Sequence, residues 1–296
     1  MITRRSLLAM GAMALAPRSA CDTHTHVFGA VAKFPMSPAR GYTPPEASPA
    51  EMLAMHKKLG VERVVIVTPS VYGTDNAATL FGIREYGKGA RGVAVIDAKT
   101  PDADLKAMAA AGVCGVRVNL GGPGAALEGA KERLVQALDR VSGMGWHVQL
   151  YAGLNVVEAV ADVILRAPVA VVIDHVAGAL PAEGVGQKGF GALLRLVREG
   201  KAYVKVTHRF LPSGTGPEYG DSVAMLRALL EANQERVLWG TDWPHPDSGR
   251  VPGRKTTDLA PFEKVDDVAW LERFIGWLGP AKERVLVENP GRLYGY

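Results

Sequence analysis

Eight short runs of apolar, mostly β-branched residues recur along the chain, and successive runs begin roughly 20 to 40 residues apart. Several of these runs are almost continuously apolar, which is typical of strands buried on both faces of a parallel sheet. The pattern predicts strands near residues 22–27, 63–68, 92–96, 113–119, 146–151, 169–174, 202–207 and 236–241.

The segments between these runs carry apolar residues at helical spacing. The stretch PAEMLAMHKKLG, for example, places Met52, Met55 and Leu59 on one face of a helix that ends at a glycine. The stretch TPDADLKAMAAAG begins with Thr100, which we expect to cap the helix that follows it. A strand followed by a helix, repeated eight times, predicts a (β/α)8 barrel.

We therefore expect a single distorted (β/α)8 TIM barrel of the α/β class over residues 21–296. The alternative is an open, doubly wound sheet, which usually carries a glycine-rich phosphate-binding turn after its first strand. Here the first strand leads instead into a long proline-bearing loop, residues 26–48. Such a loop is a candidate cover for the mouth of a barrel.

Residues 1–20 differ from the rest of the chain. Arg4 and Arg5 precede an apolar run from Leu7 to Ala16, which is too short to span a bilayer as a stable helix. The stretch TRRSLL resembles a twin-arginine export signal. The sequence predicts a leader over residues 1–20 and a periplasmic protein with no membrane association once the leader is removed. The alternative is an uncleaved amphipathic tail on a cytoplasmic protein.

Composition excludes several classes of function. The formal net charge is only +4, and no basic run is interleaved with aromatic residues, so we expect no nucleic-acid partner. Two cysteines, Cys21 and Cys114, cannot form a disulfide framework, and we expect buried free thiols. The apolar content of 48% is enough for one large core.

Histidines and an aspartate gather at the ends of the predicted strands. His24 and His26 lie two residues apart in the first strand, so strand alternation points both side chains the same way. His175 follows the sixth strand and Asp242 follows the eighth. Each residue alone has an ordinary structural explanation, such as a turn or a surface position. Because the carboxyl ends of barrel strands meet on one rim, their joint occurrence favours an active site.

Several motifs resemble the amidohydrolase superfamily, and in particular its 2-pyrone-4,6-dicarboxylate lactonase group. These are DTHTH, DHVAG, VLWGTDWPHP and ENPGRLYGY, and the likeness covers nearly all of residues 21–296. The resemblance implies a distorted (β/α)8 barrel that hydrolyses a small carboxylated lactone. It also implies that Asp242 is the general base towards water, while His24, His26 and His175 polarise the lactone carbonyl.

The resemblance bears on the metal content as well. A binuclear member of the superfamily generally needs a lysine or glutamate at an earlier strand, but Arg117 and Asn119 occupy the end of the fourth strand here. The lactonase group works without a divalent metal, so we expect no required cofactor. The alternative is one zinc ion, and its ligand set by residue type consists of His24, His26, His175 and Asp242.

The resemblance also implies substrate-binding residues. Arg117 and Arg209 match arginines of the lactonase group, and Tyr42 and Tyr151 match its hydroxyl donors. A guanidinium group binds a carboxylate in bidentate fashion, which suits an acidic substrate. The chain departs from the group at two further arginine positions, where it reads LGGPGAALEG after GVRVN and VAGALPAEG after DH. This loss favours a sugar-acid lactone or a monocarboxylate lactone over a pyrone dicarboxylate.

Three other functions remain as alternatives at this level. They are a mononuclear zinc-dependent amidohydrolase or decarboxylase, a lactone isomerase on the same barrel, and a non-catalytic periplasmic protein that binds small acids. A binding protein has little need for a base such as Asp242 beside three histidines. The expected partner is therefore a small-molecule lactone, and the sequence does not indicate an oligomeric state.

Overall fold

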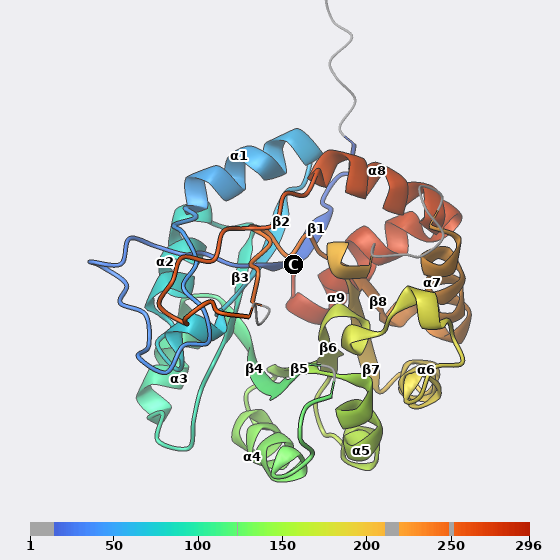
Figure 1. The fold of residues 1–296 in the computed structure, drawn as a ribbon, viewed down its shortest axis with the longest axis horizontal. Coiled ribbons are helices and arrows are strands. Elements are labelled where there is room, and N and C mark those ends of the chain that lie inside the picture. The colour runs from blue at the N-terminus through green and yellow to red at the C-terminus, as the bar shows by residue number, and fades with distance from the viewer. Residues whose placement is uncertain (1–14, 123, 211–218, 249–251) are drawn as a thin grey trace, which may run out of the picture.

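The computed structural model describes residues 15–122, 124–210, 219–248 and 252–296. In this part of the chain eight strands form one sheet in sequence order, and each strand pairs in parallel with the next. Helices surround the strands, as Figure 1 shows. The predicted (β/α)8 barrel is confirmed. The alternative of a doubly wound sheet is wrong, because such a sheet reverses its strand order.

All eight predicted strands are present, and β1, β3 and β8 each end two residues earlier than predicted. His26 therefore lies just beyond β1 and not within it, while His175 and Asp242 follow β6 and β8 as predicted. The strands are β1 (Cys21–Thr25), β2 (Arg63–Val67), β3 (Ala90–Ala94), β4 (Val113–Gly121), β5 (His147–Ala152), β6 (Val171–Ile173), β7 (Ala202–Val206) and β8 (Val237–Trp239).

Helices α1 to α8 cover the outside of the barrel, and α9 contributes Tyr294 to its interior. The described helices are α1 (Pro49–Leu59), α2 (Ala77–Tyr86), α3 (Asp102–Ala110), α4 (Ala130–Val141), α5 (Leu154–Leu165), α6 (Phe190–Arg198), α7 (Gly220–Asn233), α8 (Asp267–Leu278) and α9 (Asn289–Tyr294). The start and end of α1 follow from its sequence, because Ser48 and Glu51 form a reciprocal capping box and Gly60 ends the helix in the left-handed conformation.

The predicted cap of α3 is wrong. Pro101 occupies the cap position, and no side chain caps the helix. The Thr100 hydroxyl instead accepts the Asp97 backbone N–H at 3.1 Å and donates to the Asp97 carboxylate at 3.1 Å. A local turn therefore competes successfully for the threonine, which is a general tendency of short polar side chains.

Strand alternation divides the apolar residues between two cores. In β2, Val64 and Ile66 pack outwards against the helices, whereas Val65 and Val67 join a cluster inside the barrel. Tyr294 of α9 belongs to this inner cluster and is 2% exposed. The lower interior of the barrel is thus filled by side chains, and the polar residues described below occupy its upper end.

The join between β8 and β1 differs from the other joins. In the described part of the chain a parallel bridge links Thr25 with Trp243, and side chains complete the connection. The Thr23 hydroxyl donates to the Trp239 carbonyl at 2.7 Å. The backbone N–H of Asp242 donates to the His24 carbonyl at 2.9 Å. We call this join the β8/β1 seam.

Residues 15–20 are part of the folded domain. Ala16 and Ala20 are buried, and the Ala16 N–H donates to the Leu59 carbonyl at 2.9 Å. The Ala20 carbonyl accepts the backbone N–H groups of Glu62 and Arg63 at 3.2 and 3.1 Å. Residues 1–14 of the predicted leader lie outside the described residues, so export stays a prediction. Among the described helices, none is long and apolar enough to cross a membrane.

Candidate active site

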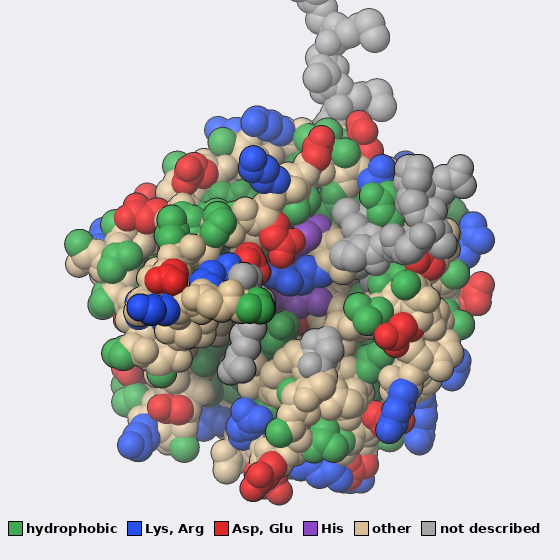
Figure 2. Space-filling model, in the orientation of Figure 1, with side chains coloured by type: hydrophobic (Ala, Val, Ile, Leu, Met, Phe, Trp, Pro, Cys, Tyr) green, Lys and Arg blue, Asp and Glu red, His purple; other side chains and the backbone are tan. Residues whose placement is uncertain are grey.

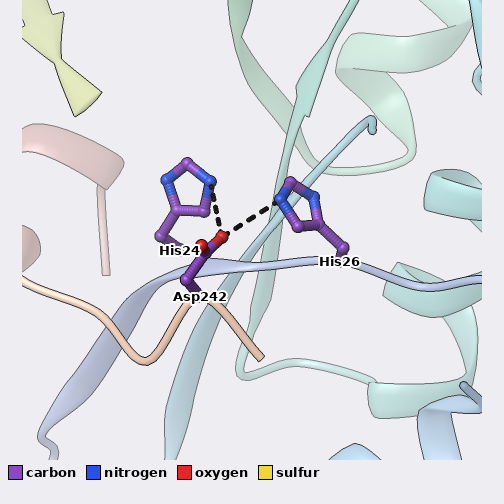
Figure 3. Close-up of side chains that lie close together, drawn as sticks. All are labelled: His24, His26 and Asp242. Atoms are coloured by element: carbon purple, nitrogen blue, oxygen red, sulfur yellow. Dashed lines mark ion pairs between the residues drawn. The ribbon is translucent and has the colours of Figure 1, made fainter. Parts of the chain in front are cut away.

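His24, His26 and Asp242 meet at the top of the β8/β1 seam, as Figure 3 shows. The Asp242 Oδ1 atom lies 3.3 Å from His26 Nε2 and 3.6 Å from His24 Nε2. All three side chains are buried. The first strand thus presents both histidines towards the residue that follows the eighth strand, so the predicted convergence of these three side chains is present in the structure.

His175 joins this group from the turn Asp174–Gly178 after β6. Its ring centre lies 4.7 Å from that of His24, and its Nδ1 atom lies 2.8 Å from the Thr207 hydroxyl oxygen. His175, Val176 and Ala177 all adopt positive φ angles of 51–55°. Three successive non-glycine residues in this conformation are unfavourable, and such strain is concentrated at functional sites.

Burial and charge set the protonation of these groups. Burial lowers the pKa of His24 to about 4, which favours its neutral form, and burial also lowers the pKa of His175. Burial acts to raise the pKa of Asp242. The neighbouring imidazoles and the Arg209 guanidinium outweigh burial and hold this pKa well below its usual range. Asp242 is therefore a carboxylate at neutral pH.

The tautomer of His26 is fixed by the backbone. Its Nδ1 atom lies 2.8 Å from the Val67 carbonyl oxygen, which can only accept a hydrogen bond, so Nδ1 carries a proton. A neutral His26 then presents a lone pair on Nε2 to the Asp242 carboxylate. Neither His24 Nε2 nor Asp242 Oδ1 has a hydrogen-bond partner in the described structure. A proton between Asp242 Oδ1 and one imidazole would satisfy two of these atoms, and a metal cation would satisfy all three.

The donor set fits one divalent ion. The ligand atoms of His24, His26 and Asp242 all lie within 4.8 Å of one another, as do those of His24, Asp174 and His175. Two imidazoles and a carboxylate match the usual ligands of a catalytic zinc ion. Such an ion would supply a Lewis acid and lower the pKa of a bound water molecule.

A second buried layer supports His24 from below. Asp174 Oδ1 lies 3.2 Å from His24 Nδ1, while its Oδ2 accepts from Arg117 Nε at 3.0 Å and from Gln149 Nε2 at 3.1 Å. Lys205 donates to Gln149 Oε1 at 2.7 Å and lies 3.5 Å from His24 Nδ1. Burial lowers the pKa of Lys205 to about 8. Sequence reasoning assigned no role to Asp174, Gln149 or Lys205.

Each arginine near the centre is paired with a carboxylate. Arg117 binds Asp174 through Nε and stacks over the Tyr151 ring, with its guanidinium carbon 5.0 Å from the ring centre. Arg209 donates from Nε to Asp242 Oδ2 at 2.9 Å and from Nη2 to the Pro246 carbonyl at 2.6 Å. Because Arg209 holds Oδ2, the Oδ1 atom of Asp242 is left to face the two histidines.

A cavity opens above these groups, and Figure 2 shows histidine and basic side chains in the central hollow. It contains every predicted site residue except His24, which lies beneath it and is fully buried. Sequence reasoning missed the hydroxyls of Ser70 and Ser248, which no motif marked. The lining residues are His26, Tyr42, Pro69, Ser70, Arg117, Asn119, Tyr151, His175, Arg209, Asp242, Pro246 and Ser248.

A parallel barrel with a histidine–carboxylate centre at the carboxyl end of its strands has the architecture of a TIM-barrel enzyme. Residues 21–296 match the amidohydrolase family model, so the chain belongs to this family, and the predicted resemblance is confirmed. The apo crystal structure of Atu3138 from Agrobacterium tumefaciens is 28% identical. Its TM-score is 0.78, and the match covers 95% of this chain and 97% of that one.

Two curated relatives are more similar in sequence. The 2-pyrone-4,6-dicarboxylate hydrolase of Comamonas testosteroni is 34% identical over 290 residues, which cover 94% of this chain and 90% of the relative. The 4-sulfomuconolactone hydrolase of Hydrogenophaga intermedia is 34% identical over 291 residues, which cover 94% of this chain and 89% of the relative.

Proposed function

We propose that this protein is a lactonase that opens small carboxylated lactones by hydrolysis. One observation carries the proposal: Asp242 is held as a carboxylate by Arg209 at Oδ2, while its Oδ1 faces two histidines at the floor of the cavity. The two curated relatives, both named as hydrolases of lactone-type compounds, support the same reaction class.

The reaction needs a base that takes a proton from water and a group that polarises the lactone carbonyl. Asp242 Oδ1 accepts a proton from a water molecule, and the water oxygen attacks the lactone carbonyl carbon. The ring carbon–oxygen bond then breaks, and the proton held by Asp242 passes to the ring oxygen, which leaves as a hydroxyl or enol. The new carboxylic acid ionises in solution, so each turnover releases one proton.

The histidines stabilise the charge that develops on the carbonyl oxygen. Since Nδ1 of His26 is already committed to Val67, His26 can donate from Nε2 only as an imidazolium. An imidazolium at His26 gives Asp242 Oδ1 a donor in the free enzyme, and its Nε2–H can serve the carbonyl oxygen in the transition state. A lactone is an activated ester, so this polarisation suffices without a metal ion. Arg209 also supplies the positive charge that stabilises the Asp242 carboxylate.

The finer specificity follows from the charges that line the cavity. In the described residues of the lining, Arg117 and Arg209 are both already paired with carboxylates, so they retain only part of their donors for a substrate. Neutral hydrogen-bonding groups complete the lining. We therefore favour a lactone with a single carboxylate and several hydroxyls over a dicarboxylate. The neutral groups are Tyr42, Ser70, Asn119, Tyr151 and Ser248.

A mononuclear zinc hydrolase is the second candidate, and the lone pair of His26 favours it. The converging atoms of His24, His26 and Asp242 would hold one divalent ion. The two candidates differ in what chelation removes. The lactonase keeps its rate without metal, whereas the zinc enzyme loses it.

The test is a screen of aldonolactones, aldarolactones and pyrone carboxylates against chelated protein, with proton release as the readout. We expect ring opening of a carboxylated lactone with the mass gain of one water molecule. A product of unchanged mass would indicate an isomerase. Stoichiometric zinc that tracks activity, lost together with activity on chelation, would replace the metal-independent proposal. Binding without any turnover would indicate a binding protein.

A further inference from the structure

We propose that Asp22 and Thr241 are positioning residues that hold Asp242 in its working conformation. This positioning role rests on the proposed function in one respect, namely that Asp242 acts as the base. Asp22 is fully buried and does not line the cavity. It can therefore act on the reaction only through its neighbours.

The Asp22 carboxylate ties the two sides of the β8/β1 seam together. Its Oδ1 atom accepts the backbone N–H of His24 at 3.1 Å and the backbone N–H of Thr241 at 3.0 Å. One carboxylate oxygen thus links His24 to the residue before Asp242, beside the backbone bond from the Asp242 N–H to the His24 carbonyl. Bonds of this kind between a charged acceptor and N–H donors are stronger than neutral ones.

The Thr241 side chain connects Asp22 to Trp243, the residue after Asp242. Its hydroxyl donates to Asp22 Oδ2 at 2.5 Å and accepts the backbone N–H of Trp243 at 2.9 Å. Both residues that flank Asp242 are therefore fixed from the same side. Asp242 itself has a φ of 63°, a left-handed conformation that a non-glycine residue keeps only when its surroundings enforce it.

Helix α1 supports the carboxylate from outside the barrel. His56 is fully buried, its Nε2 lies 3.1 Å from Asp22 Oδ2, and its Nδ1 lies 3.0 Å from the Tyr86 hydroxyl. These contacts lock the rotamer of Asp22. Gly240 allows the close approach, because a Cβ atom there would lie 2.8 Å from the Cβ of His24.

The test compares three buried threonine variants. Thr241→Val removes the hydroxyl while keeping the shape, Thr241→Ser restores it, and Thr23→Val removes a buried hydroxyl of the same seam that bonds to Trp239 instead. The probes are D-glucaro-1,4-lactone and 2-pyrone-4,6-dicarboxylate. We expect Thr241→Val to lower kcat about 100-fold with KM unchanged, as misplacement of a reacting group by about 1 Å does. Thr241→Ser and Thr23→Val should keep kcat near the wild-type value.

Equal losses of kcat in Thr241→Val and Thr23→Val would overturn the proposal, because both would then act through seam stability. A loss in KM rather than kcat would also overturn it. Crystal structures of the full-length variants give a readout that does not need turnover. The backbone at Asp242 should leave the left-handed conformation in Thr241→Val and keep it in the other two variants.

These readouts separate the two proposals. If the wild-type protein opens neither probe lactone, the proposed function loses support, while the position of Asp242 in the variant structures still decides the role of Thr241. If Thr241→Val fails to fold, Asp22→Asn replaces it. That variant keeps the size of the side chain and weakens the acceptor that both sides of the seam share, and an unmoved Asp242 in it would overturn the proposal.

Discussion

The wall between β4 and β5 and the β8/β1 seam solve the same structural problem in different ways. β4 and β5 pair through a long backbone ladder that runs from Gly115 opposite His147 to Gly121 opposite Ala152. In the described residues the seam has only a short backbone ladder, in which the Asp242 N–H donates to the His24 carbonyl and the His26 N–H donates to the Trp243 carbonyl. The Asp22 carboxylate and the Thr23 hydroxyl add side-chain bonds to it. A backbone ladder fixes strand geometry over its whole length, whereas side-chain bonds fix only chosen points.

This difference explains where the chemistry lies. At the seam the backbone can depart from strand geometry directly after β8, so that Asp242 turns back towards His24 and His26. At the β4–β5 wall the pairing is regular from Gly115 to Asn119 and shifts in register only before Gly121, and the regular stretch supplies Arg117 and Tyr151 to the rim. The regular wall thus places substrate-facing groups, and the irregular seam places the proposed base.

The largest effect should follow from Asp242→Asn. This change keeps the shape of the side chain but removes its capacity to accept a proton. We expect kcat for lactone opening to fall about 10²- to 10⁴-fold, the usual contribution of a general base. Steady-state kinetics with binding measured in parallel checks it, because the variant should still bind lactone. An undiminished rate would end the assignment of the base.

A matched glycine pair tests the seam against the wall. Gly240→Ala places a Cβ 2.8 Å from the His24 Cβ, whereas Gly115→Ala places one 2.3 Å from the His147 ring. Both changes overpack a buried site, and each should lower the free energy of unfolding by about 1–3 kcal/mol. Only Gly240→Ala should also lower kcat strongly, because it separates His24 from Asp242. Equal kcat in the two variants would contradict the comparison.

The two arginines separate binding from catalysis. Alanine at either position should raise KM for carboxylated lactones by the equivalent of about 1.5–3 kcal/mol, the value of a hydrogen bond to a charged group. Arg209→Ala should in addition lower kcat, because Asp242 Oδ2 loses its partner. Uncharged lactones provide the control. If their KM rises as much as that of the carboxylated ones, neither arginine recognises a carboxylate.

The sequence predicted the barrel well because its signal is repeated eight times, and an error in one strand does not change the architecture. It also predicted the meeting of His24, His26 and Asp242, because the rim of a parallel barrel collects residues that follow its strands. Pairings that cross the barrel interior carried no such signal. Lys205 lies within an apolar strand, and its contact with Gln149 depends on the register and curvature of the closed wall.

Competition between neighbouring polar groups explains why the predicted cap of α3 was wrong. Thr100 has the residue type of a helix cap, but Asp97 lies close enough in the chain to bind it first. His56 carried no motif, and the structure places it against Asp22, two residues before His24. The sequence does not show this contact, because it depends on how α1 packs against the first strand.

The smallest effect concerns Cys114 on β4, within the regular wall. Both cysteines are free, as predicted. Cys21 is buried, whereas Cys114 keeps part of its surface exposed to solvent. Burial raises the pKa of its thiol from 9.0 to about 12. The folded state therefore keeps a proton that the unfolded state loses, and the associated stability, present below pH 9, is lost as the pH rises towards 12. The stability advantage of wild type over Cys114→Ala should shrink accordingly in urea unfolding between pH 8 and 11. A constant difference would contradict it.

The short segment before β1 belongs to the folded unit. Ala16 is anchored to the end of α1, and the Ala20 carbonyl receives two N–H groups at the start of β2. A protease that cut immediately after Ala20 would expose those donors to solvent and uncover apolar surface at the amino-terminal face of the barrel. A truncated form intended for crystallisation should therefore begin no later than Leu15.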